Sequence, residues 1–142
     1  MSALDLPAPA AATPESTTLA EDLHPYVYVL IRKDLELHQQ LVQSSHAAFE
    51  AGMRWHSPGA EVASLIVLEV PHKAALLRAA KKFSGLGIEH HTFFEPDFEM
   101  GESALATRPL IGSDRKPLAG YPLWKHQVQA ASPVSQPSLE ST

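Results

Sequence analysis

Four polar residues are spaced so that they would line one face of a helix. Gln39, Gln43, His46 and Glu50 occupy positions i, i+4, i+7 and i+11, which places them within about 60° of arc on a helix. An imidazole can donate or accept a proton near neutral pH. The row could therefore line a polar cleft with His46 as acid or base, or it could be a solvated helix face.

A second candidate is the acidic stretch at residues 95–102 (EPDFEMGE), in which four carboxylates lie beside phenylalanines. Carboxylates that crowd together raise one another's pKa, and an apolar wall has the same effect. One of them, at the end of a strand, could act as a general base toward water. The alternative is a solvated acidic turn.

Two adjacent histidines, His90 and His91, precede Glu95 and Asp97 and raise the question of a metal site. In an extended strand, neighbouring side chains point to opposite faces. One ion could not easily take both imidazoles, and we predict neither a metal nor another cofactor. His91 and Glu95 would share a face, so a histidine–carboxylate pair is an open alternative.

Basic residues offer contacts for a phosphate backbone. One group falls on a predicted helix, and the other begins near the end of the last predicted long strand: Arg78, Lys81 and Lys82, then Arg108, Arg115 and Lys116. If the partner is RNA, these are the candidate phosphate contacts. The alternative is an ordinary solvated surface.

The net charge is concentrated at the ends of the chain. All 11 Lys and Arg lie between Arg32 and Lys125, whereas five of the 16 Asp and Glu lie outside that region. The central part is therefore neutral, and the formal charge of −5 belongs to the ends. This excludes a strongly basic protein that binds DNA by charge alone.

Both ends are rich in Pro, Ala or Ser and poor in large apolar residues. Such segments cannot offset the entropy of ordering them. We therefore predict a disordered tail at residues 1–24, a folded domain at residues 25–127 and a second disordered tail at residues 128–142.

No cysteine is present, which excludes a thiolate nucleophile. No apolar stretch is long enough to span a bilayer and no targeting signal is recognisable, so we expect a cytoplasmic protein without a membrane partner.

Strands and helices are predicted to alternate along the domain. Strand patterns fall at residues 25–32, 62–70, 88–95 and 103–110, with a strand-like piece near 123–125, and helical spacing falls at about 38–53 and 72–83. Right-handed crossovers make the first strands parallel. The expected fold is α/β: a two-layer or three-layer sandwich with a mixed four- to five-stranded sheet and flanking helices.

The first predicted helix carries two apolar rows. Leu41, Ser45, Ala48 and Gly52 form a row of mostly small residues, which we expect to face the sheet because small side chains allow close approach. A bulkier row borders it and consists of Val42, Phe49 and Met53. Asp34 is a candidate cap for this helix. In the second helix, Leu76, Ala80 and Phe83, with Leu77, are expected to face inward.

Two short motifs resemble the type 2 peptidyl-tRNA hydrolase family. Arg32-Lys33-Asp34-Leu35 matches the Arg-x-Asp-Leu that ends that family's first strand. Residues 39–47 (QQLVQSSHA) match its helix motif Lys-x-x-x-Gln-x-Ser-His-Ala, except that Gln39 replaces the lysine. The order of elements is similar over about residues 26–126. The Glu-Pro loop, shorter than usual for the family, is similar to that of its peptidyl-tRNA hydrolase domain-containing branch.

The resemblance implies metal-free hydrolysis of the ester between a peptide and the 3′ ribose of tRNA. It assigns catalysis to Gln43, Ser45, His46 and Asp97. Asp97 would orient or deprotonate the water, and His46 and Gln43 would help to hold the ester. Glu95 is the alternative match to the family's aspartate after the third strand. Contacts to tRNA would come from Lys33, Asp34, Gln39, Ser103, Arg78, Lys81, Lys82 and Arg108. One alternative is a catalytically inactive member of the same fold that binds RNA or a protein. Another is an unrelated α/β domain that binds a small molecule or a metal. The family also makes a homodimer one expectation for this chain.

Overall fold

Four strands form the central sheet of the computed structural model, which describes residues 23–126. They are β1 (Tyr26–Arg32), β2 (Ser64–Val70), β3 (His90–Glu95) and β4 (Gly101–Thr107), in the order β2-β1-β4-β3. β1 is parallel to β2 and antiparallel to β4, and β4 is antiparallel to β3. The predicted α/β fold with a mixed sheet is confirmed. The predicted tails lie outside the described residues, apart from Leu23 and His24.

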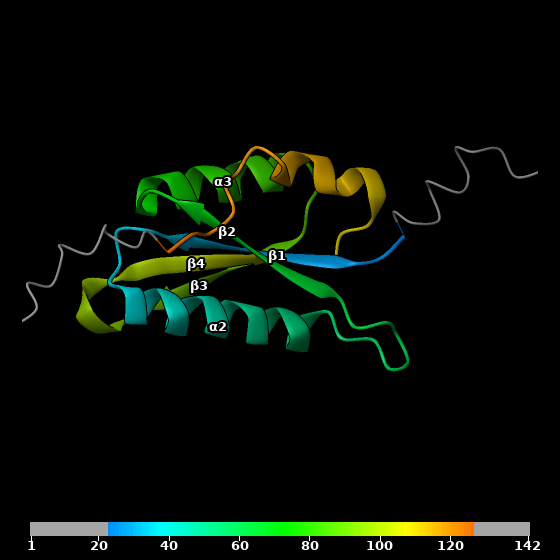
Figure 1. Cartoon of the computed structure of the whole chain (residues 1–142), viewed down its shortest axis with the longest axis horizontal. Helices are drawn as coiled ribbons and strands as arrows, with labels where there is room; N and C mark the ends of the chain where they lie inside the picture. Colours follow the sequence, from blue (N-terminus) through cyan, green and yellow to red (C-terminus); the bar gives the residue numbers. More distant parts are fainter. Residues whose placement is uncertain (1–22, 127–142) are drawn as a thin grey trace, which may run out of the picture.

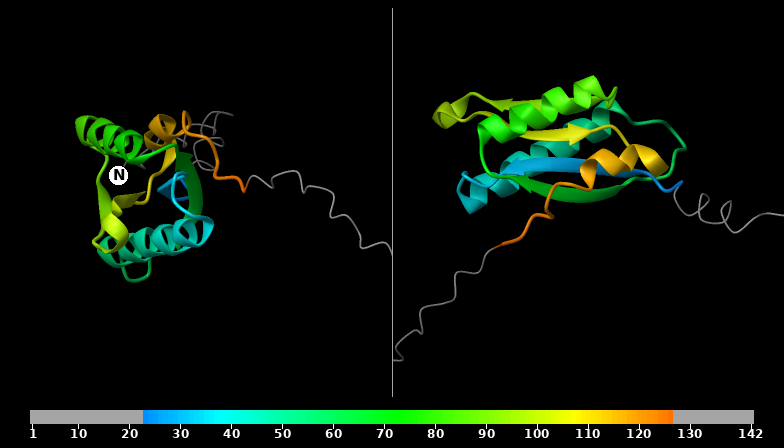
Figure 2. Two further views of the ribbon diagram at one scale, coloured as in Figure 1. Left: turned by 90° about the vertical axis from the view of Figure 1, so that its left-hand side faces the viewer. Right: turned by 90° about the horizontal axis from the view of Figure 1, so that it is seen from above.

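Helices cover both faces of the sheet, which makes the fold a three-layer sandwich (Figure 1). Helix α2 (Leu37–Arg54) packs on one face and helix α3 (Lys73–Gly85) on the other. Two short 3₁₀ helices follow later in the chain, η1 (Asp97–Glu99) and η2 (Gly112–Leu118). Figure 2 shows η2 on the same side of the sheet as α3. Within residues 23–126, no helix is long and apolar enough to cross a lipid bilayer.

The sheet has a different core on each face, because side chains alternate along every strand. In β1, Tyr28 and Leu30 belong to the core beneath α3, whereas Val29 and Ile31 belong to the core beneath α2. The α3 side is built from large residues such as Phe83. The α2 side is built mainly from alanines of the helix and of β4. Helix α2 can therefore approach the sheet closely.

The prediction of which row of α2 faces the sheet is wrong. The buried residues of this helix are Gln40, Gln43, Ala47 and Ala51. The predicted inward row is instead largely exposed, with Leu41 at 68%, and the bulky row also faces outward, with Phe49 at 68% and Met53 at 71%. The physical reason is that both buried glutamines have hydrogen-bond partners, which removes most of the cost of burying them.

Helix α2 also begins differently from the prediction. Asp34 is not its cap, because Glu36 is the residue that precedes the first helical turn. The backbone N–H of Glu36 donates to Oε1 of Gln39 at 3.1 Å, which is one half of a capping box. Gln39 is thus used in starting the helix. In α3, Leu76 and Phe83 are buried as predicted, with Ala79 rather than Ala80 between them. Leu77, predicted to face inward, is instead 41% exposed.

The predicted strand-like piece near residues 123–125 pairs with β2 through a single antiparallel bridge, Leu68 with Leu123. The indole N–H of Trp124 donates to Oε1 of Gln40 at 2.8 Å. The segment is therefore attached both to the sheet edge and to α2. The sheet itself has four strands.

Candidate functional site

A chain of hydrogen bonds connects α2 to the neighbouring ends of β3 and β4. Ser103 Oγ donates to Gln43 Oε1 at 2.8 Å, and Gln43 Nε2 donates to Glu95 Oε2 at 3.2 Å. The remaining carboxylate oxygen of Glu95 accepts the backbone N–H of Asp97 at 3.0 Å. Ser103 and Gln43 are buried, whereas Glu95 is half-buried. The network thus ends in a carboxylate at the surface.

A β-bulge explains how Ser103 reaches α2. Ala104, which faces α2, lies opposite Phe93, but the next partner pair is Phe94 with Glu102, so Ser103 is the extra residue of β4. In a regular strand the neighbour of Ala104 would face the other side of the sheet. Bulges re-aim side chains in this way. The bulge turns the hydroxyl of Ser103 toward Gln43.

The carboxylate of Glu95 is held in its ionised form. Its pKa is lowered chiefly by the hydrogen bond from the backbone N–H of Asp97, then by the amide of Gln43, with a smaller contribution from the charge of His46. Partial desolvation opposes these effects. At neutral pH, Glu95 is therefore a hydrogen-bond acceptor that can orient a water molecule.

His46 lies on the surface one helical turn after Gln43. Its ring stacks on the ring of Phe93, with the centroids 4.8 Å apart and the planes 7° from parallel. Stacking restricts the orientation of the imidazole while leaving the side chain accessible. The predicted polar row of α2 is therefore neither a fully solvated face nor a continuous cleft. Gln43 is buried and His46 is exposed beside it.

Asp97 is exposed at the start of η1. Its backbone N–H donates to Glu95, and its carboxylate makes no hydrogen bond or ion pair with any residue from 23 to 126. Phe98 and Glu99 follow with φ of 58° and 52°. Such left-handed conformations cost non-glycine residues energy and persist only where neighbouring structure maintains them.

Arg32 stabilises the turn that contains Phe98 and Glu99. Its Nη1 donates to the carbonyl oxygens of Met100 at 2.8 Å and Glu102 at 3.0 Å. Its Nε and Nη2 form a two-pronged ion pair with the carboxylate of Asp34, at 3.0 and 2.8 Å. The Arg32 guanidinium is the main reason that the pKa of Asp34 lies below its ordinary value. Asp34, predicted to contact tRNA, thus holds Arg32 in place.

Sequence reasoning assigned no role to Arg32. The available signal was a single arginine at the end of an otherwise apolar strand, which calls for a partner because a buried charge must be paired. Arg32 is only 8% exposed. It fixes the turn that follows Glu95, so it positions the site.

Other predicted site residues lie apart from this network. Ser45 is exposed and donates to the carbonyl of Leu41 in its own helix at 2.7 Å. Lys33 pairs with Glu69 at 3.4 Å and donates to the carbonyl of Lys125 at 2.6 Å. The structure therefore brings together Gln43, His46, Ser103 and the Glu95–Asp97 turn, but not Ser45 or Lys33.

The two adjacent histidines point to opposite faces, as predicted. His90 packs against Phe83 of α3, whereas His91 contacts Glu50 of α2. The alternative pairing of His91 with Glu95 is wrong, since Gln43 lies against Glu95 and Glu50 faces His91. Residues 23–126 contain no cluster of three or more His, Asp or Glu that could hold a metal ion.

The predicted phosphate contacts differ in how far other side chains already engage them. Arg78 and Lys82 line a pocket on the α3 side of the sheet, while Lys81 lies outside its lining. Arg108 pairs with Asp114 at 3.3 Å. Arg115 stacks over Tyr26 and donates to the hydroxyl of Tyr28 at 2.9 Å, so it stabilises the fold.

No known protein-family profile matches this sequence. No curated protein matches it significantly. Among solved structures, the chain is similar to a protein of unknown function, Atu0240, from Agrobacterium tumefaciens strain C58, with a TM-score of 0.54 and 13% identity over 71% of this chain and 98% of that one. At this level of identity, the similarity concerns the fold alone.

Proposed function

We propose that this protein hydrolyses the ester bond joining a peptide to the 3′ ribose of tRNA. The observation that supports this most is the hydrogen bond between Gln43 and Glu95. It joins the helix that resembles the hydrolase motif to a carboxylate at the end of β3, near where the resemblance implies an acidic group. His46 of the same motif is accessible beside that carboxylate.

In the proposed reaction, Glu95 and His46 act on one water molecule. Glu95 accepts a hydrogen bond from the water and orients it toward the ester carbonyl. His46 takes the proton as the water attacks and gives it to the departing 3′ oxygen of the ribose. Such general acid–base assistance contributes about 10²- to 10⁴-fold in rate, and an ester is activated enough to need no metal.

Gln43 and Ser103 have positioning roles. Gln43 holds Glu95, and Ser103 holds the amide of Gln43 in the orientation that presents its NH₂ group to the carboxylate. Arg32 and Asp34 maintain the turn that brings the N–H of Asp97 to Glu95. Asp97 itself is the alternative group for orienting the water, because its carboxylate is exposed beside the same site.

The test is release of labelled peptide from peptidyl-tRNA by the purified protein, with and without a chelator. We expect turnover that survives chelation. Glu95→Gln and His46→Ala should each lower kcat by about 10²-fold, and Asp97→Asn should lower it by less than about threefold. Ser45→Ala, on an exposed position of the same helix, is the matched control.

If Asp97→Asn abolishes turnover while Glu95→Gln does not, Asp97 is the water-orienting group and our assignment is wrong. If neither acidic variant changes the rate, the reaction does not use this site.

A second function, RNA or protein binding without catalysis, is favoured by one observation. Gln39 replaces the lysine of the motif and its side chain caps α2, so no cation stands at that position. Binding of tRNA to the purified chain without any release of peptide would support this function and contradict the first.

A further inference from the structure

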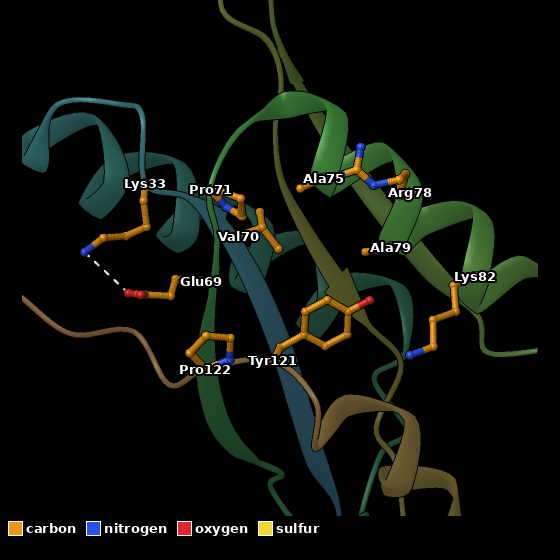
Figure 3. Close-up of a pocket in the computed structure, with 10 residues that line it drawn as sticks. All are labelled: Lys33, Glu69, Val70, Pro71, Ala75, Arg78, Ala79, Lys82, Tyr121 and Pro122. Carbon is orange, nitrogen blue, oxygen red and sulfur yellow. Dashed lines mark ion pairs between the residues drawn. The ribbon is translucent and has the colours of Figure 1, made fainter.

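A pocket of about 630 Å³ opens on the side of the sheet that α3 covers (Figure 3). It lies between α3, the end of β2 and the segment near Tyr121. The hydrogen-bond network of Ser103, Gln43 and Glu95 is on the opposite face of the sheet, which α2 covers. The lining combines three cations, one acid, one aromatic ring and an apolar wall that contains two prolines; the charged and aromatic residues are Lys33, Arg78, Lys82, Glu69 and Tyr121.

The charges in this pocket do not cancel. Lys33 is offset by Glu69, the one carboxylate in the lining. Arg78 makes no hydrogen bond or ion pair within residues 23–126. Among the described residues, Lys82 makes a long hydrogen bond, 3.4 Å, to the carbonyl of Pro117, and its Nζ lies 5.3 Å from the centre of the Tyr121 ring. Two positive charges therefore remain available to a ligand.

Tyr121 gives the pocket a flat apolar surface beside these cations. Its ring is half-buried and packs edge-on against Phe83, with centroids 6.0 Å apart. Figure 3 shows its hydroxyl on the side toward α3. Partial burial raises the pKa of Tyr121, so the hydroxyl is protonated at neutral pH and can donate a hydrogen bond. It has no hydrogen-bond partner among the described residues.

We propose that this pocket binds a nucleotide, with its phosphate between Arg78 and Lys82 and its base against Tyr121 and the proline wall. A phosphate monoester carries close to two negative charges at pH 7, which matches Arg78 and Lys82, two cations that have no carboxylate partner among residues 23–126. Arginine can bind phosphate through two parallel hydrogen bonds. The volume falls in the range of small-ligand pockets, about 300–1,000 Å³, and the apolar wall would be left uncovered by inorganic phosphate alone.

The same chemistry could come from a free mononucleotide or from one nucleotide of an RNA strand. Either source places a phosphate beside a flat ring. The inference does not depend on ester hydrolysis, because the pocket and the Glu95 site lie on opposite faces of the sheet.

The experiment is isothermal titration calorimetry of the full chain with the four ribonucleoside 5′-monophosphates, with adenosine and with inorganic phosphate. We expect at least one monophosphate to bind about tenfold or more tightly than either adenosine or phosphate. Arg78→Gln and Lys82→Gln should each weaken that binding about tenfold. Lys81→Gln removes the same charge from the same helix outside the pocket and should change it less than about twofold.

Two further variants test the ring. Tyr121→Leu should weaken binding by removing the stacking surface, whereas Tyr121→Phe should retain most of it. Thermal melting of each variant separates a binding defect from loss of fold.

A short single-stranded oligoribonucleotide is then added as competitor. Displacement of the monophosphate identifies an RNA strand as the source, and no displacement identifies a free nucleotide.

The proposal fails if no monophosphate binds, if adenosine or inorganic phosphate binds equally well, or if Lys81→Gln weakens binding as much as Arg78→Gln. If the purified protein binds a monophosphate but does not hydrolyse peptidyl-tRNA, the proposed function is contradicted and this inference stands.

Discussion

Gln43 is a buried polar residue whose two amide atoms serve two different groups. Its oxygen accepts from Ser103 and its nitrogen donates to Glu95. Because both amide atoms have partners, a glutamine can be buried on the inner face of α2 beside alanines. It also links the ionisation of a surface carboxylate to the packing of the core.

Replacing Gln43 should therefore change the titration of Glu95. In Gln43→Met, a substitution of similar volume, the pKa of Glu95 should rise toward its ordinary value, because one of its two hydrogen bonds is lost. It should stay somewhat low, because the Asp97 N–H remains. An NMR pH titration of the Glu95 carboxyl carbon measures this. We expect a stability cost of about 1–3 kcal/mol. Ser45→Ala should leave the titration unchanged, and an unchanged titration in Gln43→Met would contradict the network.

The pairing of Asp34 with Arg32 should make stability depend on acid pH. Because the pKa of Asp34 is lowered in the folded protein, its ionised form stabilises the fold at every pH above the ordinary Asp pKa of about 3.9. That contribution is lost as the pH falls through the lower pKa of the folded state. Glu95 and Glu102 have lowered pKa values as well, so they add to the same trend.

We expect Asp34→Asn to be less stable than the parent at pH 7 and to show a flatter decline of unfolding free energy below about pH 4. Urea denaturation at a series of pH values measures both. Asp114→Asn breaks an exposed ion pair with Arg108 and is the control, with a change of at most about 1 kcal/mol. Parallel acid profiles for the parent and Asp34→Asn would exclude the proposed role of this pair.

At the scale of elements, helix α2 is the one whose orientation the sequence pattern does not reveal. Its large apolar residues lie on the outer face, and its inner face consists of alanines and paired glutamines. Helix α3 follows the usual arrangement more closely, with Leu76 and Phe83 fully buried. Equivalent substitutions on the two helices should therefore have very different effects.

Phe83→Ala in α3 should destabilise the protein by about 3–5 kcal/mol, because the ring is fully buried. Phe49→Ala in α2 removes the same group from a position that is 68% exposed and should change stability by about 0.5 kcal/mol or less. Chemical denaturation of both variants gives the comparison. Similar losses for the two would mean that Phe49 is covered in solution, and the molecular mass should then be measured to look for a homodimer.

At the scale of the whole molecule, the proposed hydrolytic site and the proposed nucleotide pocket lie on opposite faces of one sheet. Glu95 and His46 belong to the α2 side, and Arg78, Lys82 and Tyr121 belong to the α3 side. Substitutions at separated sites usually have additive effects. The functions proposed for the two faces can therefore be tested independently in one protein.

The domain boundaries can be tested by shortening the chain. All buried residues named above lie between Tyr28 and Leu118. A chain of residues 23–126 should accordingly retain the melting temperature of the full chain within about 2 °C, because a ΔΔG of 1 kcal/mol shifts it by several degrees in a domain of this size. A clear loss of stability would show that residues 1–22 or 127–142 contribute contacts, contrary to the prediction of disordered tails.

Most of the fold could be predicted from the sequence because its signals are local. Apolar β-branched runs, helical spacing and turn residues identified four strands and two helices, with ends within about two residues for the helices and β1. The opposite orientation of His90 and His91 follows from the period of two in a strand. The resemblance to a hydrolase motif drew attention to Gln43 and His46.

The rest of the site depends on interactions between segments far apart in the chain, and only the tertiary structure decided it. Ser103 faces α2 because of a bulge that the alternation of residues does not reveal. Burial of Gln43 became favourable only because Ser103 and Glu95 supply its partners. Arg78, Lys82 and Tyr121 share a pocket because α3 and a segment some 40 residues later pack side by side. The residue types and local periods are determined by the sequence alone, whereas the partner of each buried polar group is determined by packing.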